Sequence, residues 1–317
     1  MNKNNKIELL VLPSVKNIEE ITKNINVKVT KAYYTELEFI FKNNKASILH
    51  NGRDINSFSA VWLSSYWSTR DIATAIKQYL DSYNIPTTHV ESGTSKLTDA
   101  MGFSLENIPT PDTYFLKYTQ TLHHLDDIEK ICGFPVIMKT TKGFGGLNAK
   151  FIKSKKELIA EIESRNKNYE YMFQRFIPND YDWGIMVVNG KVVSGERSYP
   201  KSGEFRNNHS IGATEIFADI ETIPEEVKEI AINGAKALGL SWSRSDIVVD
   251  KTTKQPYLLE VNRFPGITSK TTEVSGAREF IKNYLDINGL LPKEMPDKES
   301  SLLPNLKIAS TVSNRRI

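Results

Sequence analysis

The residues best suited to chemistry in this sequence are three oxygen-bearing side chains on two apolar runs. The run at residues 257–261 carries Glu260 and is followed by Asn262. Side chains alternate along a strand, so these two would lie on one face. Asp246 opens an earlier apolar run that would pair with this one through a turn at residues 251–254. Oxygen ligands of this kind suit Mg²⁺ that carries a phosphate, whereas the simpler interpretation is the solvated face of a sheet.

A glycine-rich segment follows Lys139, which ends a predicted strand. Gly143, Gly145 and Gly146 would let backbone N–H groups approach an anion closely, and the lysine adds positive charge. The segment fits neither G-x-x-x-x-G-K-S/T nor a G-x-G-x-x-G pattern that opens a helix. We interpret it as a phosphate cradle, with a flexible hairpin and a surface lysine as the alternative.

The elements that must hold these residues include both strands and helices. Near the N-terminus we expect strands at 7–12 and 58–63 and a helix at 69–83, which indicates an open α/β domain. Residues 108–111, Ile-Pro-Thr-Pro, break that pattern as a domain boundary would. The elements expected beyond it are helices at 116–132, 157–163 and 224–238, strands at 136–139 and 171–176, and a hairpin at 185–193 that turns at Asn189-Gly190.

The composition excludes several classes of protein. The 317 residues include 41 basic and 38 acidic side chains, and the formal charge of +3 is too small for a nucleic-acid-binding surface. The single cysteine, Cys132, rules out an intrachain disulfide and a cysteine-based zinc site, and we expect it to be buried packing rather than a nucleophile. We find no membrane-spanning run and no signal sequence, so we expect a soluble, cytoplasmic protein.

Taken in order, these pieces resemble the ATP-grasp superfamily, and within it the RimK-like carboxylate-amine ligases. The pieces are Lys139 after Gly-Phe-Pro, the glycine-rich segment, residues 174–177, a following acid, Arg206-Asn207-Asn208, Asp246, Glu260-x-Asn262 and Pro265-Gly266. No single piece is specific to the family, but their order is. The resemblance covers residues 108–284 and implies an α/β (α+β) ATP-grasp fold preceded by an open α/β domain.

The resemblance also implies how the chain divides into domains. We expect an N-terminal α/β domain at 1–107, a lid or small subdomain at 108–183, a C-terminal subdomain with the metal site at 184–290, and a peripheral tail at 291–317.

An ATP site is implied as well. The residues expected to hold the nucleotide are Lys96, Lys139, Gly143, Gly145, Gly146, Gln174, Arg175, Phe176, Ile177 and Asp182. Both lysines would contact the phosphates. The segment 174–177 would be the hinge that reads adenine, and Asp182 would bind the ribose hydroxyls.

The metal and catalytic residues are also carried over from the family. Asp246, Glu260 and Asn262 match its ligands for Mg²⁺, with Glu260 bridging two ions and Mn²⁺ as an alternative metal. Arg206 and Asn208 resemble the F-R-x-N motif. In that motif the arginine stabilises phosphoryl charge and the asparagine helps to fix the acyl intermediate.

The sequence departs from the family pattern mainly in its arginines. The family usually has Asp-Ile-Arg where this chain has Asp182-Trp183-Gly184, so that arginine is missing. The family has a catalytic arginine upstream of F-R-x-N. Arg197 matches that arginine only if one extra residue is allowed between it and the motif. Arg263, next to Asn262, could contact an anionic substrate or make a salt bridge. His209 could be a general base or an exposed loop residue.

These residues point to an ATP-dependent ligase that joins a carboxylate to an amine. A carboxylate is a poor electrophile, so attack by an amine requires an acyl phosphate made with the γ-phosphate of ATP. ADP and phosphate would be released, and the reaction depends on positioning and charge neutralisation. A small-molecule kinase on the same fold and a nucleotide-binding module without ligation are the alternatives.

The substrate is expected at the N-terminal domain, where the segment 62–70 is rich in aromatic and hydroxyl side chains. Arg70 could hold a carboxylate in a bidentate contact, and Ser65 and Arg263 would join it. The alternative is that this segment is core and a helix N-cap. The partners would be small or peptide carboxylates and amines, without nucleic acid or membrane, and a homo-oligomer is one option.

Overall fold

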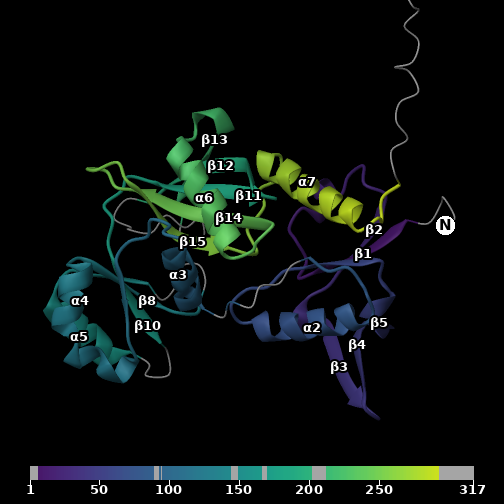
Figure 1. The fold of residues 1–317 in the computed structure, drawn as a ribbon, viewed down its shortest axis with the longest axis horizontal. Coiled ribbons are helices and arrows are strands. Elements are labelled where there is room, and N and C mark those ends of the chain that lie inside the picture. Colours follow the sequence, from purple (N-terminus) through teal and green to yellow (C-terminus); the bar gives the residue numbers. More distant parts are fainter. Residues whose placement is uncertain are drawn as a thin grey trace, which may run out of the picture.

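The structure is a computed structural model that describes residues 6–88, 93, 95–143, 149–165, 170–201 and 212–292. Its strands form sheets of three, four, five and three strands. Figure 1 shows the N-terminal domain on one side of the molecule and the four- and five-stranded sheets, each with its own helices, on the other.

A parallel sheet is the framework of the N-terminal domain. Strand β1 (Ile7–Leu12) lies between β2 (Val27–Lys31) and β6 (Ala60–Leu63) and pairs in parallel with both. Helix α2 (Arg70–Ser82) packs on one face through Ala73 and Ile76. The domain is completed by α1 (Ile18–Ile21) and the antiparallel strands β3 (Leu37–Lys42), β4 (Lys45–His50) and β5 (Arg53–Asp54). The predicted mixture of strands and helices is confirmed.

The other face of this parallel sheet is buried against the C-terminal part of the chain. Val11 and Trp62 share a core with Phe280 of helix α7 (Thr272–Ile287). The ring of Trp62 lies 6.0 Å from that of Trp242, centre to centre. Trp62 is therefore a core residue that fixes the N-terminal domain on the rest of the molecule.

A four-stranded antiparallel sheet, here called the lid sheet, forms the small subdomain. Its order is β7 (Thr113–Phe115), β10 (Tyr171–Arg175), β8 (Val136–Thr140) and β9 (Lys150–Ile152). Helices α4 (Leu125–Cys132) and α5 (Lys155–Ser164) pack on it, and Cys132 is buried there, as predicted.

The helix predicted at 116–132 is shorter than expected. Residues 118–123 form a 3₁₀ turn, and the α-helix starts at Leu125. Asp126 and Asp127 lie in its first turn, where negative charge favours a helix N-terminus. These acids explain why the helix begins there.

A five-stranded antiparallel sheet, the central sheet, follows. Its order is β13 (Thr214–Ala218), β12 (Lys191–Tyr199), β11 (Asp182–Val188), β14 (Trp242–Val249) and β15 (Pro256–Asn262). Helix α6 (Glu225–Ala237) covers one face, where Trp183, Ile185 and Ile247 are buried. Strand β11 begins at Asp182, so the predicted boundary at 183 falls inside a strand. The change from lid sheet to central sheet lies between Arg175 and Asp182.

Candidate active site

The three predicted metal ligands meet on neighbouring strands of the central sheet. Asp246 on β14 pairs with Glu260 on β15, and the Asn262 amide donates to Asp246 Oδ2 at 3.0 Å. The register shifts after Asp246, so Glu260 faces Asp246 while Leu258 faces Ile247. Such a bulge re-aims side chains at the end of a strand. The predicted pairing of the two runs is confirmed.

The half-buried carboxylates of Asp246 and Glu260 lie beside the cations of Arg244 and Lys96. Burial raises the pKa of Asp246 to about 6. Burial acts in the same direction on Glu260, but the Lys96 ammonium in contact with it holds the pKa of Glu260 below its usual value. Two carboxylates and an amide fit Mg²⁺. No group of three or more His, Cys, Asp or Glu side chains suited to a metal occurs in the part of the chain that the structure describes.

Lys139 and Gln174 project from the lid sheet on the side away from its helices. Residues alternate along β8 and β10, and Met138 and Phe173 turn into the helix-covered core. The Lys139 ammonium donates to Gln174 Oε1 at 2.9 Å. Burial, aided by the charge of Lys96, lowers the pKa of Lys139 to about 8.

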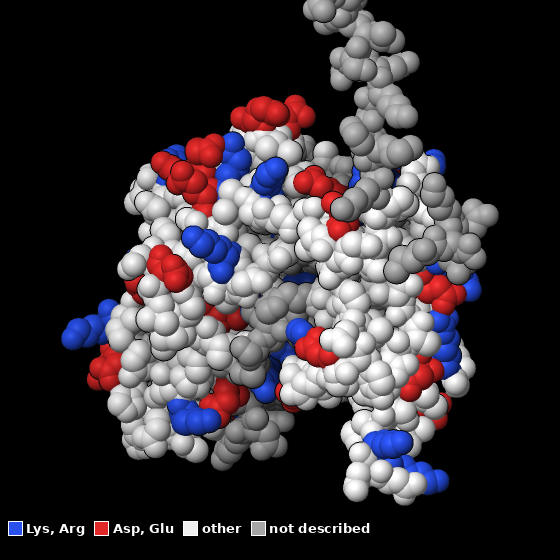
Figure 2. Space-filling view, turned by 45° about the vertical axis from the view of Figure 1, so that its right-hand side comes forward, with Lys and Arg blue, Asp and Glu red and all other residues white. Residues whose placement is uncertain are grey.

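A cavity of about 220 Å³ separates the lid sheet from the central sheet. Helix α3 (Lys96–Leu105) forms a third wall. The cavity brings together four residues that were predicted from distant parts of the sequence: Lys96, Lys139, Gln174 and Glu260. Figure 2 shows the surface hollowed near its centre, with Lys or Arg atoms in blue visible inside the hollow.

Other predicted nucleotide residues lie outside the lining of this cavity. Arg175 forms an ion pair with Asp112 at 3.1 Å, and the ring of Phe176 packs on that of Phe151. Ile177 is buried. Two further predicted residues also lie outside the cavity lining. They are Gly143, whose φ is +143°, and Asp182, which begins β11.

Several predictions concern residues outside the described ranges. These are Gly145 and Gly146 of the glycine-rich segment, and Arg206, Asn208 and His209 of the F-R-x-N region.

Arg197 does not reach this site. It pairs with Trp183 across β11 and β12, on the face that α6 covers, and its guanidinium lies 4.7 Å from the Trp183 ring centre. The neighbours Glu196 and Ser198 take the opposite face, on which Asp246 lies. This corrects the prediction that Arg197 is catalytic, because strand alternation turns it away from the predicted metal ligands.

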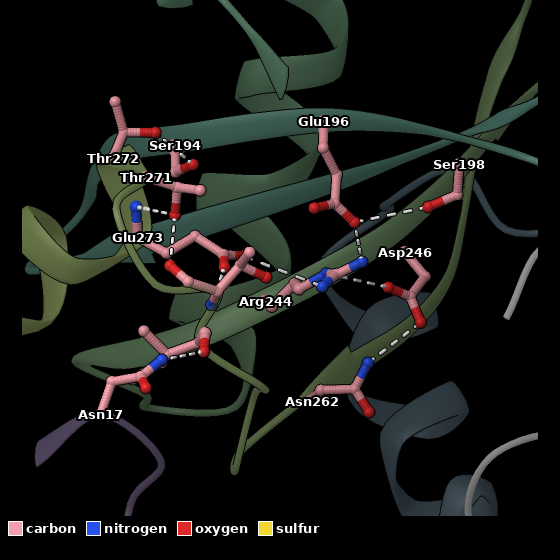
Figure 3. A network of polar contacts seen from close by, with 12 residues as sticks. Asn17, Ser194, Glu196, Ser198, Arg244, Asp246, Asn262, Thr271, Thr272 and Glu273 are labelled. Atoms are coloured by element: carbon pink, nitrogen blue, oxygen red, sulfur yellow. Dashed lines mark hydrogen bonds and ion pairs between the residues drawn. The ribbon is translucent and has the colours of Figure 1, made fainter. Parts of the chain in front are cut away.

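Arg244 supplies a guanidinium that the sequence analysis missed. It is paired with Glu196, its Nε lies 3.8 Å from Asp246 Oδ1, and its Nη1 lies 3.9 Å from Glu273 Oε1. Figure 3 shows it between these three carboxylates. Burial raises the pKa of Glu196 to about 7, against the effect of Arg244. The sequence did contain a signal for this position, because Arg244 stands two residues before Asp246 on one strand and therefore lies on the same face.

Gly184 provides the space for this guanidinium. A Cβ at Gly184 would lie 2.6 Å from Arg244 Nε and Nη2. Gly184 stands where the Asp-Ile-Arg pattern has its arginine. In this chain Arg244, on the adjacent strand β14, fills the space beside Gly184.

All three predicted substrate residues border a second cavity, of about 370 Å³. Its lining includes Ser65, Arg70 and Arg263, together with Glu260 and Asn262. This brings the segment 62–70 of the N-terminal domain next to the predicted metal ligands.

Arg263, which lines this second cavity, forms a salt bridge, one of the two roles that the sequence left open for it. Its Nη1 and Nη2 donate to the two oxygens of Asp99 at 2.9 and 2.6 Å. Arg263 thus makes a buried ion pair with α3 while it also lines the cavity.

The fold and the site together define an ATP-grasp ligase. A lid sheet and a central sheet enclose a lysine-lined cavity that ends at Glu260, which pairs with Asp246 across β14 and β15. A family model described as the RimK-like ATP-grasp domain matches residues 96–283, and the chain belongs to that family. It is an enzyme of the ligase class that forms C–N bonds and produces ADP.

Relatives with curated names are similar over much of their length. A probable alpha-L-glutamate ligase from Aeromonas salmonicida is 28% identical over 233 residues, which cover 71% of this chain and 76% of the relative. A protein of the same name from Coxiella burnetii is 33% identical over 160 residues, 48% of this chain and 51% of the relative.

Solved structures share the fold. VanG D-Ala:D-Ser ligase from Enterococcus faecalis superposes with a TM-score of 0.66 at 16% identity, covering 90% of this chain and 99% of that one. The ATP-grasp ligase PsnB with its minimal precursor gives 0.61 at 17% identity, covering 88% and 98%. None of the helices within the described ranges is long and apolar enough to cross a membrane.

Proposed function

We propose that this enzyme activates a substrate carboxylate with ATP and transfers the acyl group to an amine. The observation that carries the proposal is the position of Glu260, which lines both cavities. One cavity is lined by two lysines that suit phosphates, and the other is lined by Arg70 and by Arg263, which is itself held by Asp99. Phosphoryl transfer between them would therefore take place at Glu260.

The reaction would proceed in two steps. A carboxylate oxygen of the substrate attacks the γ-phosphorus of ATP, so that an acyl phosphate forms and ADP leaves. The amine nitrogen then attacks the acyl carbon, phosphate departs with the bonding electron pair, and the nitrogen loses a proton. Such transfers require positioning and charge neutralisation rather than a protein nucleophile.

We assign the roles by charge and position. Lys96 and Lys139 neutralise the phosphates, and the Gln174 end of the lid sheet lies where the nucleotide would bind. Asp246, Glu260 and Asn262 would hold Mg²⁺, which supplies charge neutralisation of the phosphates when bound. With Glu260 engaged in that way, the ammonium of Lys96 would be available to the nucleotide phosphates.

Arg244 takes the place that Arg197 cannot fill. Its strand neighbour across β14 and β15 is Asn262, so its charge lies beside the proposed metal ligands. We assign it to the stabilisation of negative charge at the reacting groups, together with Arg206 and Asn208.

The proposal is tested by trapping the acyl phosphate. Hydroxylamine attacks an acyl phosphate to give a stable hydroxamate, so ATP, Mg²⁺ and hydroxylamine are incubated with amino acids, short peptides and other carboxylates. We expect ADP and hydroxamate in equal amounts with the true substrate. A stable phosphorylated product without hydroxamate would identify a kinase, and ATP binding without ADP formation would identify a binding module.

The ATP affinity should depend on pH through Lys139. Its pKa of about 8 means that its charge is present below that pH and is lost above it. ATP phosphates prefer the charged form, so affinity should weaken as pH rises above 8, by up to about ten-fold per unit. Calorimetric titration with ATP and Mg²⁺ across this range measures the effect.

Two variants complete the pH test. Lys139→Arg keeps its charge and should give an affinity that barely changes across the range. Lys150→Arg, an exposed lysine on β9, should behave like the wild type. A wild-type affinity that is the same on both sides of pH 8 would contradict the proposed contact.

A further inference from the structure

A β-hairpin of the N-terminal domain projects into solvent. Strands β3 and β4 pair along their whole length around a turn at Asn43 and Asn44. Both turn residues have positive φ, of 51° and 59°, as a two-residue hairpin turn requires. Figure 1 shows the hairpin extending from the domain, away from the lid sheet and the central sheet. Its surface is therefore separate from the ATP site.

One edge of β3 is open. The strand order of this sheet is β3, β4 and β5, and no other strand in the described part of the chain pairs with β3. The residues that flank a two-residue turn exchange both backbone hydrogen bonds, and such pairs alternate along the ladder. Lys42 therefore bonds toward β4, whereas the N–H and C=O groups of Phe39 and Phe41 point out of the open edge. An edge of this kind can pair with a strand of another chain.

The apolar face of the hairpin continues past the core of its domain. Leu37 and Phe39 pack against the core under α2, but Phe41, the next residue on that face, is 80% exposed. Ile40, on the opposite face, is 39% exposed. Two large apolar side chains thus lie in solvent beside the open edge, and a strand that covered them would gain hydrophobic stabilisation.

The sequence of β3 is complementary to itself. Two copies related by a two-fold axis perpendicular to the sheet would pair antiparallel, with the same face of each hairpin on one side. When the axis passes beside Ile40, Phe39 lies opposite Phe41 of the second copy, and their outward N–H and C=O groups meet. The same register puts Glu38 opposite Lys42 of the second copy. Aromatic pairs and opposite charges are cross-strand pairs that stabilise a sheet.

The neighbouring symmetric register lacks this charge pair. When the axis passes beside Phe39, Glu38 lies opposite Ile40 of the second copy, and Lys42 lies opposite Glu36. Glu36 is in the 3₁₀ turn before β3, where its carboxylate already accepts a hydrogen bond from the Tyr33 N–H at 2.8 Å. The charges therefore favour the register centred on Ile40.

We propose that two copies of this chain form a dimer by antiparallel pairing of β3 with β3 about Ile40, which joins the two three-stranded sheets into one of six strands. Each copy offers the same surface to the other, so the assembly closes at two copies. Because the interface is centred on one short strand, we expect a dissociation constant on the order of 1–100 μM.

Charge-exchange variants of the full-length protein test this dimer by sedimentation velocity. The wild type should shift from monomer to dimer between about 1 and 200 μM. Glu38→Lys and Lys42→Glu each put like charges opposite one another at two symmetric positions, so each should weaken association about ten-fold or more. An equimolar mixture of the two variant proteins should associate as well as the wild type, because opposite charges then face each other again.

A lysine across the turn provides the matched control. Lys45→Glu makes the same charge change as Lys42→Glu, but Lys45 lies on β4, away from the open edge, and should weaken association far less. All three substituted side chains are exposed, so the variants should keep the wild-type melting temperature.

A cysteine variant tests the register. In the proposed pairing Ile40 lies opposite itself without a backbone hydrogen bond, with the Cα atoms about 4.5 Å apart, close enough for a disulfide. Ile40→Cys should therefore form a covalent dimer under mild oxidation, whereas the wild type, whose single cysteine is the buried Cys132, should not.

Three results would overturn the inference. One is a wild-type protein that stays monomeric over the whole concentration range. Another is a dimer that Glu38→Lys and Lys42→Glu leave as strong as in the wild type, because it would use a different surface. The third is an Ile40→Cys protein that dimerises without forming the disulfide, because the strands would then pair in another register.

Discussion

Replacing Glu260 by glutamine is expected to lower the rate of ADP formation by about 10²-fold or more. The amide keeps the shape of the side chain but loses the charge that would hold Mg²⁺ opposite Asp246. It also removes the ion pair with Lys96. ADP formation is measured at saturating ATP and Mg²⁺, and ATP affinity is measured separately by calorimetry.

A carboxylate on the same hairpin provides the control for this variant. Asp250 accepts hydrogen bonds from the backbone N–H groups of Thr252 and Thr253 at 2.8 and 2.9 Å, so it stabilises the turn rather than the site. Asp250→Asn should keep the wild-type turnover and lose a little stability. If Glu260→Gln turned over ATP as fast as Asp250→Asn, Glu260 would have no part in the reaction.

Substituting alanine for Gly184 should remove activity through Arg244. The new Cβ would lie 2.6 Å from the guanidinium, which is held by the buried Glu196 and cannot move without leaving its acidic partners. We expect turnover to fall by about 10²-fold. The overpacking should also cost about 1–3 kcal/mol of unfolding free energy. Steady-state kinetics and thermal unfolding measure the two effects.

The adjacent strand offers a matched glycine for comparison. A Cβ at Gly195 would lie 2.4 Å from Cδ1 of Ile223, on the face that α6 covers. Gly195→Ala should therefore lower stability as Gly184→Ala does, but the folded protein should keep its turnover. Equal losses of turnover in both variants would mean that Gly184 acts only through packing, and the role assigned to Arg244 would be withdrawn.

The position of the proposed metal ligands could be predicted from the sequence because it depends on local rules. Period-two alternation puts Glu260 and Asn262 on one face, and a tight turn at residues 251–254 brings Asp246 beside them. Both rules act within a single hairpin. The bulge that shifts the register after Asp246 was not predicted, and it does not change which residues meet.

Arg197 could not be assigned in the same way. Arg244 shares a strand and a face with Asp246, but Arg197 lies on β12, and the face that it takes depends on the register with β11. Trp183 lies opposite Arg197, and Gly184 leaves space for Arg244. A shift of one residue in register would exchange the faces. The pairing of β12 with β11 therefore has no signal within either of these two strands.

The sequence by itself determined the family, the hairpin of proposed metal ligands and the lysines of the proposed phosphate site, because these follow from residue order and short-range alternation. Only the tertiary structure decided that Arg197 lies on the face away from Asp246, and that Arg70 meets Arg263 on the ring of Trp67. The physical reason is the distance along the chain. Contacts between separate sheets and domains depend on how whole faces pack, and no local pattern encodes that packing.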